Sequence, residues 1–194
     1  AAGYNQLVKE GKWSKTPLFC LLDYPMMELS EKTMGLIGYG NLAKSVEHLA
    51  RSFGMNILIS ERKDAQTVRA GRVSFQTLLN ESDIISIHCP LTENTRDLFG
   101  IPEFKAMKPS AILVNTARGG IVNEMELISA LNNNEIAGAA VDVISTEPPP
   151  KDYPLIGNQP DNLIITPHIA WATLESRTRL LHLLANNIKN SGLV

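Results

Sequence analysis

Short apolar runs alternate with helical patterns from residue 33 onward. Apolar runs that predict strands lie at 34–37, 56–60, 84–88, 111–115, 137–143 and 163–166. Helical spacing of apolar positions predicts helices at 41–51, 74–79, 101–106, 123–132 and 172–187. Runs rich in Ile, Val and Leu that are separated by helices are typical of a parallel sheet covered on both faces. The pattern therefore predicts an α/β fold with a doubly wound, Rossmann-type parallel sheet.

Residues 1–31 are the least regular part of the chain, with a short helix expected around 4–9 and an extended piece at 16–23. Their apolar side chains, including Trp13, Leu18, Phe19 and Leu22, have two interpretations. They pack on the edge of the domain, or they form an arm that contacts a second subunit. We divide the chain into an arm or linker (1–31), a nucleotide-binding domain (32–189) and a short tail (190–194). After the prolines at 148–150, residues 151–161 are expected to form a long surface loop.

Closely spaced glycines follow the first predicted strand. Gly38, Gly40 and Ala43 form a GxGxxA pattern. The first glycine permits a tight turn, the second lets a pyrophosphate approach the backbone, and the small third residue lets helix and strand pack closely. The following helix offers free N–H groups and a positive dipole end to phosphates. Glycines also serve ordinary strand-to-helix turns, so the pattern needs supporting context.

That context is a strand, a helix and a second strand, which together make a βαβ unit of the expected size. Glu61 stands just after the second strand, 21 residues beyond Gly40. An acidic side chain at this place accepts hydrogen bonds from an adenosine ribose. The stretch therefore predicts a dinucleotide site.

Composition narrows the class of protein. With 194 residues, 44% hydrophobic and 20% charged, the chain should form one globular unit. A net charge of −2 and a pI near 6.1 argue against nucleic acid or an anionic membrane as a partner. No apolar run reaches membrane-spanning length and the first residues do not resemble a signal peptide, so we expect a cytoplasmic protein. Cys20 and Cys89 have no CxxC or metal spacing and are expected to be reduced thiols, with no metal site.

Polar residues follow the last three predicted strands. Arg118, Glu147 and His168 come after strands four, five and six. In a doubly wound sheet these loops lie at the nicotinamide end of the crevice. An arginine binds a carboxylate through two parallel hydrogen bonds, and a histidine donates a proton near neutral pH. A neighbouring carboxylate fixes the orientation of the imidazole. The three residues therefore suit the reduction of a carbonyl.

Each of them also has a structural interpretation. Arg118 would cap a turn before a helix, Glu147 would be a solvated loop acid, and His168 would be a satisfied core histidine. For the other three histidines, His48, His88 and His182, the structural interpretation is preferred.

Five stretches resemble the D-isomer-specific 2-hydroxyacid dehydrogenases, in the order in which that family has them. They are GLIGYGNLA, HCPLTENTR, VNTARGGIVNE, AAVDVISTEPP and ITPHIAWAT. Within the family, the SERK, DVISTEPP and HIAWAT segments are most similar to glycerate dehydrogenases, also called hydroxypyruvate reductases.

The resemblance implies that Arg118 binds substrate, that His168 is the acid/base and that Glu147 is its partner. It also implies that the Asn41 and Leu42 amides meet the pyrophosphate, and that Asp142 and the Ala117 backbone hold the nicotinamide carboxamide. The full set of cofactor-binding residues that we expect is Gly38, Tyr39, Gly40, Asn41, Leu42, Glu61, Arg62, Pro90, Thr95, Thr116, Ala117, Asp142, His168 and Ala170.

The resemblance further implies an NAD cofactor, a 2-oxo or 2-hydroxy acid substrate and a homodimer. Glu61 stands where aspartate is commoner, and this acidic residue makes NAD the preferred cofactor. Arg62 and Lys63, which follow it, would suit the 2′-phosphate of NADP, so NADP stays the alternative. Family members have a substrate domain built from N-terminal and C-terminal segments that residues 1–194 do not include. Two other functions stay open: a nucleotide-sensing module of the corepressor type, and an isolated domain that binds cofactor without catalysis.

Overall fold

The computed structural model describes residues 2–24, 26–157 and 159–191. Most of the predicted tail (190–194) lies outside these residues, as do Ala1 and Pro25 of the predicted arm. None of the helices in these ranges combines the length and the hydrophobicity that crossing a membrane requires.

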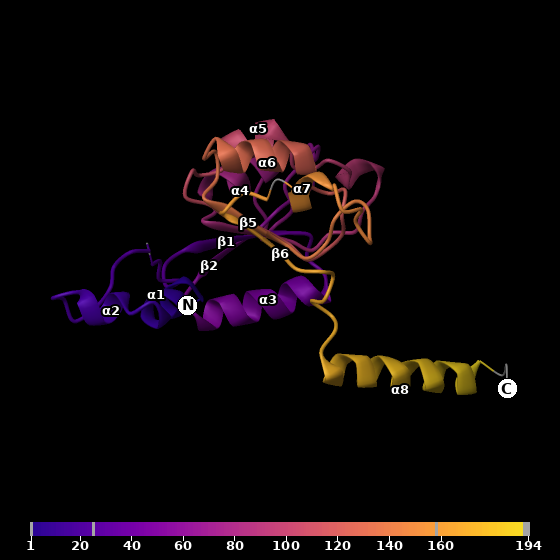
Figure 1. The fold of residues 1–194 in the computed structure, drawn as a ribbon. Coiled ribbons are helices and arrows are strands. Elements are labelled where there is room, and N and C mark those ends of the chain that lie inside the picture. Colours follow the sequence, from indigo (N-terminus) through magenta and orange to yellow (C-terminus); the bar gives the residue numbers. More distant parts are fainter. Residues whose placement is uncertain (1, 25, 158, 192–194) are drawn as a thin grey trace.

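Six parallel strands form one sheet in the order β2-β1-β3-β4-β5-β6 (Figure 1). They are β1 (Thr33–Ile37), β2 (Asn56–Ile59), β3 (Ile84–Ile87), β4 (Ile112–Asn115), β5 (Gly138–Val141) and β6 (Leu163–Ile165). Every predicted strand is present, and the strand order reverses direction between β1 and β3. The predicted fold class is confirmed, and the reversal marks the edge where a doubly wound sheet binds its ligand.

Helices α4 (Phe75–Glu81), α5 (Ile101–Ala106) and α6 (Glu124–Asn132) lie on one face of the sheet, and α3 (Asn41–Ser52) lies on the other (Figure 1). Leu36, Ile85 and Leu113 of the strands are fully buried under these helices. The buried residues of α3 are Ala43 and Ala50. Because alanine is small, α3 packs closely on the strands.

The last helix does not cover the sheet, although we expected the helices to cover both of its faces. Helix α8 (Leu174–Asn190) projects away from the sheet, and none of its described side chains is buried (Figure 1). Its leucines stay exposed because no other described element packs on them. The helix was predicted from its apolar spacing, but a spacing pattern does not say which surface its apolar face meets.

The prediction of a continuous loop at 151–161 was wrong. A short helix, α7 (Pro154–Gly157), interrupts it, and its Leu155 is buried in the core. Proline at the first helical position starts such a turn readily, because the missing N–H would be unpaired there in any case. Two further short helices were not predicted: α2 (Lys12–Lys15) and the 3-10 turn η1 (Glu93–Thr95).

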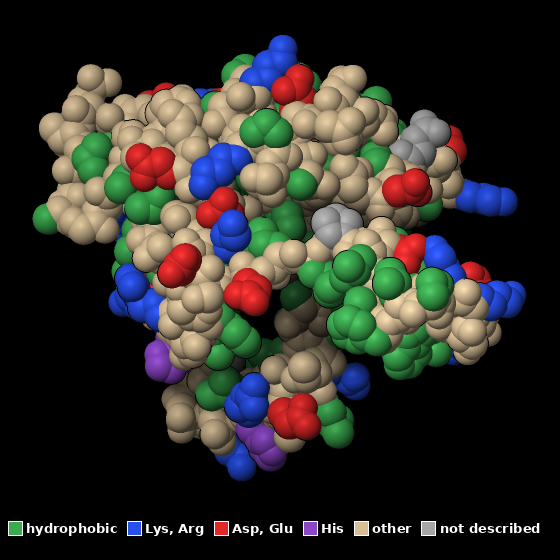
Figure 2. Space-filling model, turned by 90° about the vertical axis from the view of Figure 1, so that its left-hand side faces the viewer, with side chains coloured by type: hydrophobic (Ala, Val, Ile, Leu, Met, Phe, Trp, Pro, Cys, Tyr) green, Lys and Arg blue, Asp and Glu red, His purple; other side chains and the backbone are tan. Residues whose placement is uncertain are grey.

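The N-terminal segment folds on itself rather than on the sheet edge. It begins with α1 (Ala2–Lys9), and the Trp13 indole donates to the Phe19 carbonyl at 3.0 Å. Trp13 is 51% exposed and Phe19 is 90% exposed. Figure 2 views the molecule from the side of α1 and α2 and shows hydrophobic side chains gathered on this face. The edge-packing interpretation is therefore not supported, and a contact with a second subunit stays a prediction.

The turn after β1 explains why two glycines are needed for different reasons. Gly38 has φ 85°, and a Cβ there would lie 2.8 Å from the Cys89 backbone nitrogen. Gly40 has an ordinary extended backbone and nothing within 4 Å of the place of a Cβ. The first glycine is required by the fold, whereas the second leaves open space beside the start of α3.

Gly38→Ala should lower the free energy of unfolding by about 2 kcal/mol or more, because a left-handed backbone and a backbone clash combine. The matched variant Gly40→Ala should cost at most about 1 kcal/mol, since alanine is only a poorer N-cap than glycine. Urea unfolding followed by circular dichroism measures both. Equal losses in the two variants would contradict this account of the turn.

Candidate active site

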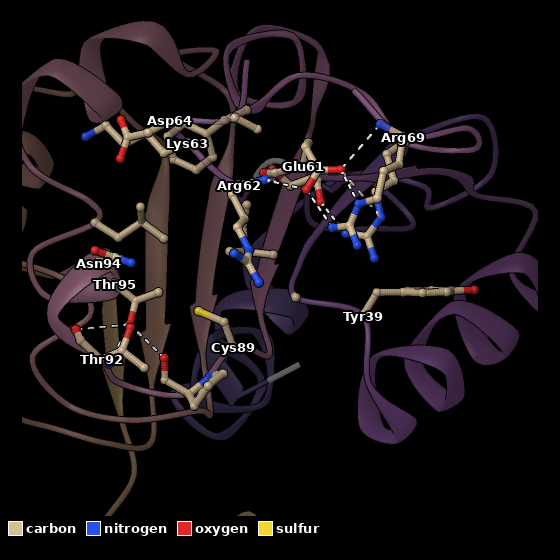
Figure 3. Close-up of a pocket in the computed structure, with 18 of the residues that line it drawn as sticks. Tyr39, Glu61, Arg62, Lys63, Asp64, Arg69, Cys89, Thr92, Asn94 and Thr95 are labelled. Carbon is tan, nitrogen blue, oxygen red and sulfur yellow. Dashed lines mark hydrogen bonds and ion pairs between the residues drawn. The ribbon is translucent and has the colours of Figure 1, made fainter. Parts of the chain in front are cut away.

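Two cavities open at the carboxyl edge of the sheet. The larger, of about 1050 Å³, lies over the ends of β1, β2 and β3, and Figure 3 shows its lining. The smaller, of about 480 Å³, lies over the ends of β5 and β6. This division matches the expected placement of an adenosine end and a nicotinamide end. Of the predicted cofactor residues, the larger cavity is lined by Gly38, Tyr39, Glu61, Arg62, Pro90 and Thr95, and the smaller by Asp142 and His168.

Glu61 lies at the end of β2 and is 5% exposed. Its carboxylate accepts two hydrogen bonds from the Arg69 guanidinium, both at 2.6 Å, and one from the Arg62 backbone N–H at 3.0 Å. The bonds from the Arg69 side chain, and then that from the Arg62 backbone, lower the pKa of Glu61 to about 2. Glu61 is thus ionised and firmly held at the place predicted for a ribose acceptor.

The loop after β3 closes the opposite wall of the larger cavity. The Thr95 hydroxyl donates to the Pro90 carbonyl and accepts from the Thr92 backbone N–H, both at 2.7 Å. These bonds fold residues 90–95 into a turn, so Pro90 and Thr95 face Glu61 across the cavity, as Figure 3 shows for Thr95. Their predicted place on the adenosine side agrees with this geometry, while their contact with cofactor stays a prediction.

The start of α3 faces the same edge. Gly40 is the N-cap and has no side chain to satisfy the first N–H groups, which include those of Asn41 and Leu42. The Tyr39 hydroxyl donates to Glu47 of α3 at 2.5 Å and ties the turn to its helix. Open space at Gly40, first-turn amides that no side chain of the described residues caps, and a positive helix end together fit a pyrophosphate.

In the smaller cavity, His168 and Glu147 meet. The imidazole Nδ1 lies 2.6 Å from Glu147 Oε2, and the Ile144 N–H donates to Glu147 Oε1 at 2.9 Å. Burial raises the pKa of Glu147, but the hydrogen bonds from His168 and Ile144 outweigh it and leave the pKa below its ordinary value. The carboxylate therefore holds Nδ1 and leaves Nε2 for another partner. His168 itself has a left-handed φ of 54°, a backbone strain often found at functional sites.

Asp142 anchors the loop that carries His168. Its buried carboxylate accepts from the Thr166 hydroxyl at 2.5 Å and from the Ile169 and Ala170 backbone N–H groups, each at 2.9 Å. Burial raises the pKa of Asp142, but these hydrogen bonds outweigh it, so the pKa lies below 3.8. The structure gives Asp142 a definite role as a loop anchor, and its predicted contact with a carboxamide stays a prediction.

Arg118 is not brought into contact with the other two predicted catalytic residues. Its guanidinium is exposed and donates to the Ala117 carbonyl at 2.6 Å. The Asn115 side chain shapes this turn by accepting from the Ala117 N–H and donating to the Arg118 carbonyl, each at 3.0 Å. Exposed Thr116 precedes them. The next residue, Gly119, packs against the backbone of Ile144, so the loops after β4 and β5 are nevertheless neighbours.

Several residues with structural roles at the site were not predicted. Glu124, at the start of α6, accepts from the Ser145 N–H at 2.6 Å and from the Ser145 and Tyr153 hydroxyls. These bonds fix the loop that ends at Glu147. Arg69 was also missed. Its signal in the sequence was its place in the basic stretch after Glu61, of which the prediction named only the first two cations.

The remaining histidines and Trp171 lie outside the smaller cavity. His48 and His182 are exposed on helices, and half-buried His88 pairs with the Ser86 hydroxyl at 2.9 Å. Trp171 is half exposed and donates to the His168 carbonyl at 3.0 Å, so it is not a core residue. It supports the backbone of the loop rather than lining the cavity.

The chain is similar in sequence to one known family of proteins. The family model described as D-isomer specific 2-hydroxyacid dehydrogenase, NAD binding domain, matches residues 1–170. The chain is 40% identical over 189 residues to a hydroxypyruvate reductase of Blautia hydrogenotrophica, covering 96% of the chain and 58% of that protein. It is 41% identical over 186 residues to a glycerate dehydrogenase of Methylorubrum extorquens, again covering 96% and 58%. The chain thus spans less than two thirds of the length of these relatives.

A solved structure shows the same fold. The NAD-complexed D-isomer-specific 2-hydroxyacid dehydrogenase of Lactobacillus delbrueckii ssp. bulgaricus superposes with a TM-score of 0.73 at 28% identity. The match covers 95% of this chain and 61% of that one.

The Asp142 anchor generates a pH-dependent prediction. Because the pKa of Asp142 is lowered on folding, its carboxylate stabilises the protein above pH 3.8, and this contribution is lost as the pH falls below that value. At pH 7, Asp142→Asn should cost about 2 kcal/mol, since one acceptor is replaced by a donor that faces an N–H group. The gap between wild type and variant should narrow as the pH falls from about 5 to about 3. Urea unfolding at each pH measures it, and a constant gap would argue against the anchor.

Proposed function

The chain belongs to the D-isomer-specific 2-hydroxyacid dehydrogenases, as their NAD-binding domain, and from this we propose that it is the cofactor-binding part of an NADH-dependent 2-oxo acid reductase. The proposed substrate is hydroxypyruvate, which is reduced to D-glycerate. The relatives named for hydroxypyruvate reduction and glycerate oxidation support this choice of substrate. The observation that carries the proposal is the His168–Glu147 pair in the wall of the smaller cavity.

The residues of this chain fit the cofactor. The bare backbone at Gly40, the free amides of Asn41 and Leu42 and the dipole of α3 would hold the pyrophosphate. The larger cavity would hold the adenosine, and the loops after β4 to β6 would hold the nicotinamide. When bound, the cofactor supplies the hydride that reaches C2 of the substrate.

The protein would supply charge and a proton. Arg118, exposed at its turn, would bind the substrate carboxylate through two N–H groups and polarise the adjacent carbonyl. His168 Nε2 would donate a proton to the oxygen on C2, which completes the hydroxyl group. Glu147, held by the Ile144 amide, would keep Nδ1 protonated and stabilise the imidazolium before transfer. Asp142 would hold the loop in place throughout.

His168→Ala in the full-length protein should lower kcat by about 10²-fold to 10⁴-fold, because general acid catalysis is lost. The dissociation constant for NADH should change little. Stopped-flow absorbance at the nicotinamide band with hydroxypyruvate measures turnover, and fluorescence titration measures binding. His182→Ala, at an exposed position of α8, is the matched control. Near-normal turnover in the His168 variant would refute the acid/base assignment.

Glu147→Gln should lower kcat less than His168→Ala, because the imidazole loses its carboxylate partner but the proton donor itself stays in place. Residues 1–194 alone should bind NADH without turning over substrate, since the chain spans only 58% of its relatives' length.

We also propose that the protein is a homodimer whose contact includes the exposed apolar N-terminal segment. Light scattering should then give a dimer mass for wild type. Replacing Trp13 and Phe19 together with serine should shift the equilibrium toward monomer, because apolar area is lost from the contact. Val68→Ser, at another exposed apolar position, is the control. A monomeric wild type would contradict the proposal.

A further inference from the structure

The ion pair between Glu61 and Arg69 lies where the adenosine ribose of a bound dinucleotide would form hydrogen bonds with the protein. Glu61 Oε1 accepts from Arg69 Nη2 at 2.6 Å and from the Arg62 N–H at 3.0 Å. Glu61 Oε2 accepts from Arg69 Nε at 2.6 Å and from the Arg69 N–H at 3.4 Å. Each carboxylate oxygen therefore has two donors already, which matches its two lone pairs.

A ribose hydroxyl that needs this carboxylate must compete with Arg69. The pair is bidentate, the strongest form of arginine–carboxylate contact, and its carboxylate is almost completely buried. The Arg69 side chain, however, is 60% exposed, and Arg69 lines the cavity. Arg69 can therefore turn into solvent at little desolvation cost, whereas Glu61 cannot leave its place.

The cations around the cavity are divided between structural and free ones. Lys63 pairs with Glu103 at 2.8 Å. Arg72 donates to the Ser60 carbonyl at 2.8 Å, and its Nε lies 4.0 Å from Glu61 Oε2, a longer ion pair than that of Arg69. The Arg62 guanidinium points into the cavity beneath Glu61 (Figure 3), and within the described residues it has no hydrogen-bond or ion-pair partner. Arg62 and the outer N–H groups of Arg69 are the cationic groups there that an incoming anion would meet.

We propose that Arg69 is a specificity-determining residue for the adenosine 2′ position, an inference that rests on the proposed cofactor-binding function. While Arg69 is paired with Glu61, it neutralises the carboxylate, and together with Arg62 it favours a 2′-phosphate as in NADPH. When Arg69 turns away, Glu61 is free to accept the ribose hydroxyls of NADH and to repel a phosphate. The position of the Arg69 guanidinium thus sets the ratio of the affinities for NADH and NADPH.

Two variants move this balance in opposite directions. Arg69→Ala removes a cation and exposes the carboxylate, so the ratio of the NADPH dissociation constant to that of NADH should rise at least about tenfold. Glu61→Gln removes the repulsive charge and frees Arg69, so the same ratio should fall at least about tenfold. Lys105→Ala removes an exposed cation of α5 that does not line the cavity, and it should change the ratio less than about threefold.

Calorimetric titration of the folded chain with NADH and NADPH measures the ratio. Parallel titrations with 5′-AMP and adenosine 2′,5′-bisphosphate should show the same shifts, because these probes reach the adenosine end alone. Circular dichroism confirms that each variant is folded.

The outcomes separate this inference from the proposed function. If wild type binds both dinucleotides and neither variant shifts the ratio, the role of Arg69 is refuted while the cofactor site stands. If Lys105→Ala shifts the ratio as much as Arg69→Ala, general charge and not the Glu61 pair is responsible, and the inference is again refuted. If the folded wild type binds no dinucleotide, the proposed function fails and this inference fails with it.

Discussion

The parallel direction of all six strands is the constraint on which the rest of this structure depends. Because every strand ends at the same edge, the loops after β1, β2 and β3 enclose one cavity and those after β5 and β6 enclose another. Residues more than a hundred positions apart, such as Gly38 after β1 and His168 after β6, therefore lie at the same edge of the sheet. The buried aliphatic side chains of the strands hold that edge rigid beneath its loops.

Carboxylates hold the loops of this edge in place, and each does so by accepting backbone N–H groups. Asp142 accepts from Ile169 and Ala170, Glu147 accepts from Ile144, and Glu124 accepts from Ser145. A loop at a sheet edge has amides that no strand satisfies, and a fixed anion supplies several acceptors at once. Glu147 also pairs with the imidazole of His168, and Asp142 adds a second negative charge near it, so loop structure and proposed chemistry share some of the same groups.

The two ends of the candidate site differ in how far they are assembled. The His168–Glu147 pair is already formed, whereas the Arg118 guanidinium donates to the Ala117 carbonyl of its own turn and Glu61 is paired with Arg69. Both arginines are exposed and long, so a bound anion can reorient them with little loss of packing. In the proposed reaction, charge recognition would therefore fall to exposed guanidinium groups, and proton transfer to a pair that is already formed.

Local pattern in the sequence determined the order and type of the main elements and the turn at Gly38, because periodicity, glycine conformation and helix caps depend on near neighbours. It also placed Arg118, Glu147 and His168 at strand ends, which a parallel topology brings to one edge. Tertiary structure alone decided which of them touch, that Asp142 anchors the His168 loop, and that Arg69 pairs with Glu61. It also decided that α8 projects away from the sheet and that α7 packs on the core through Leu155. Those outcomes depend on contacts between distant segments, and no local pattern of residues specifies such contacts.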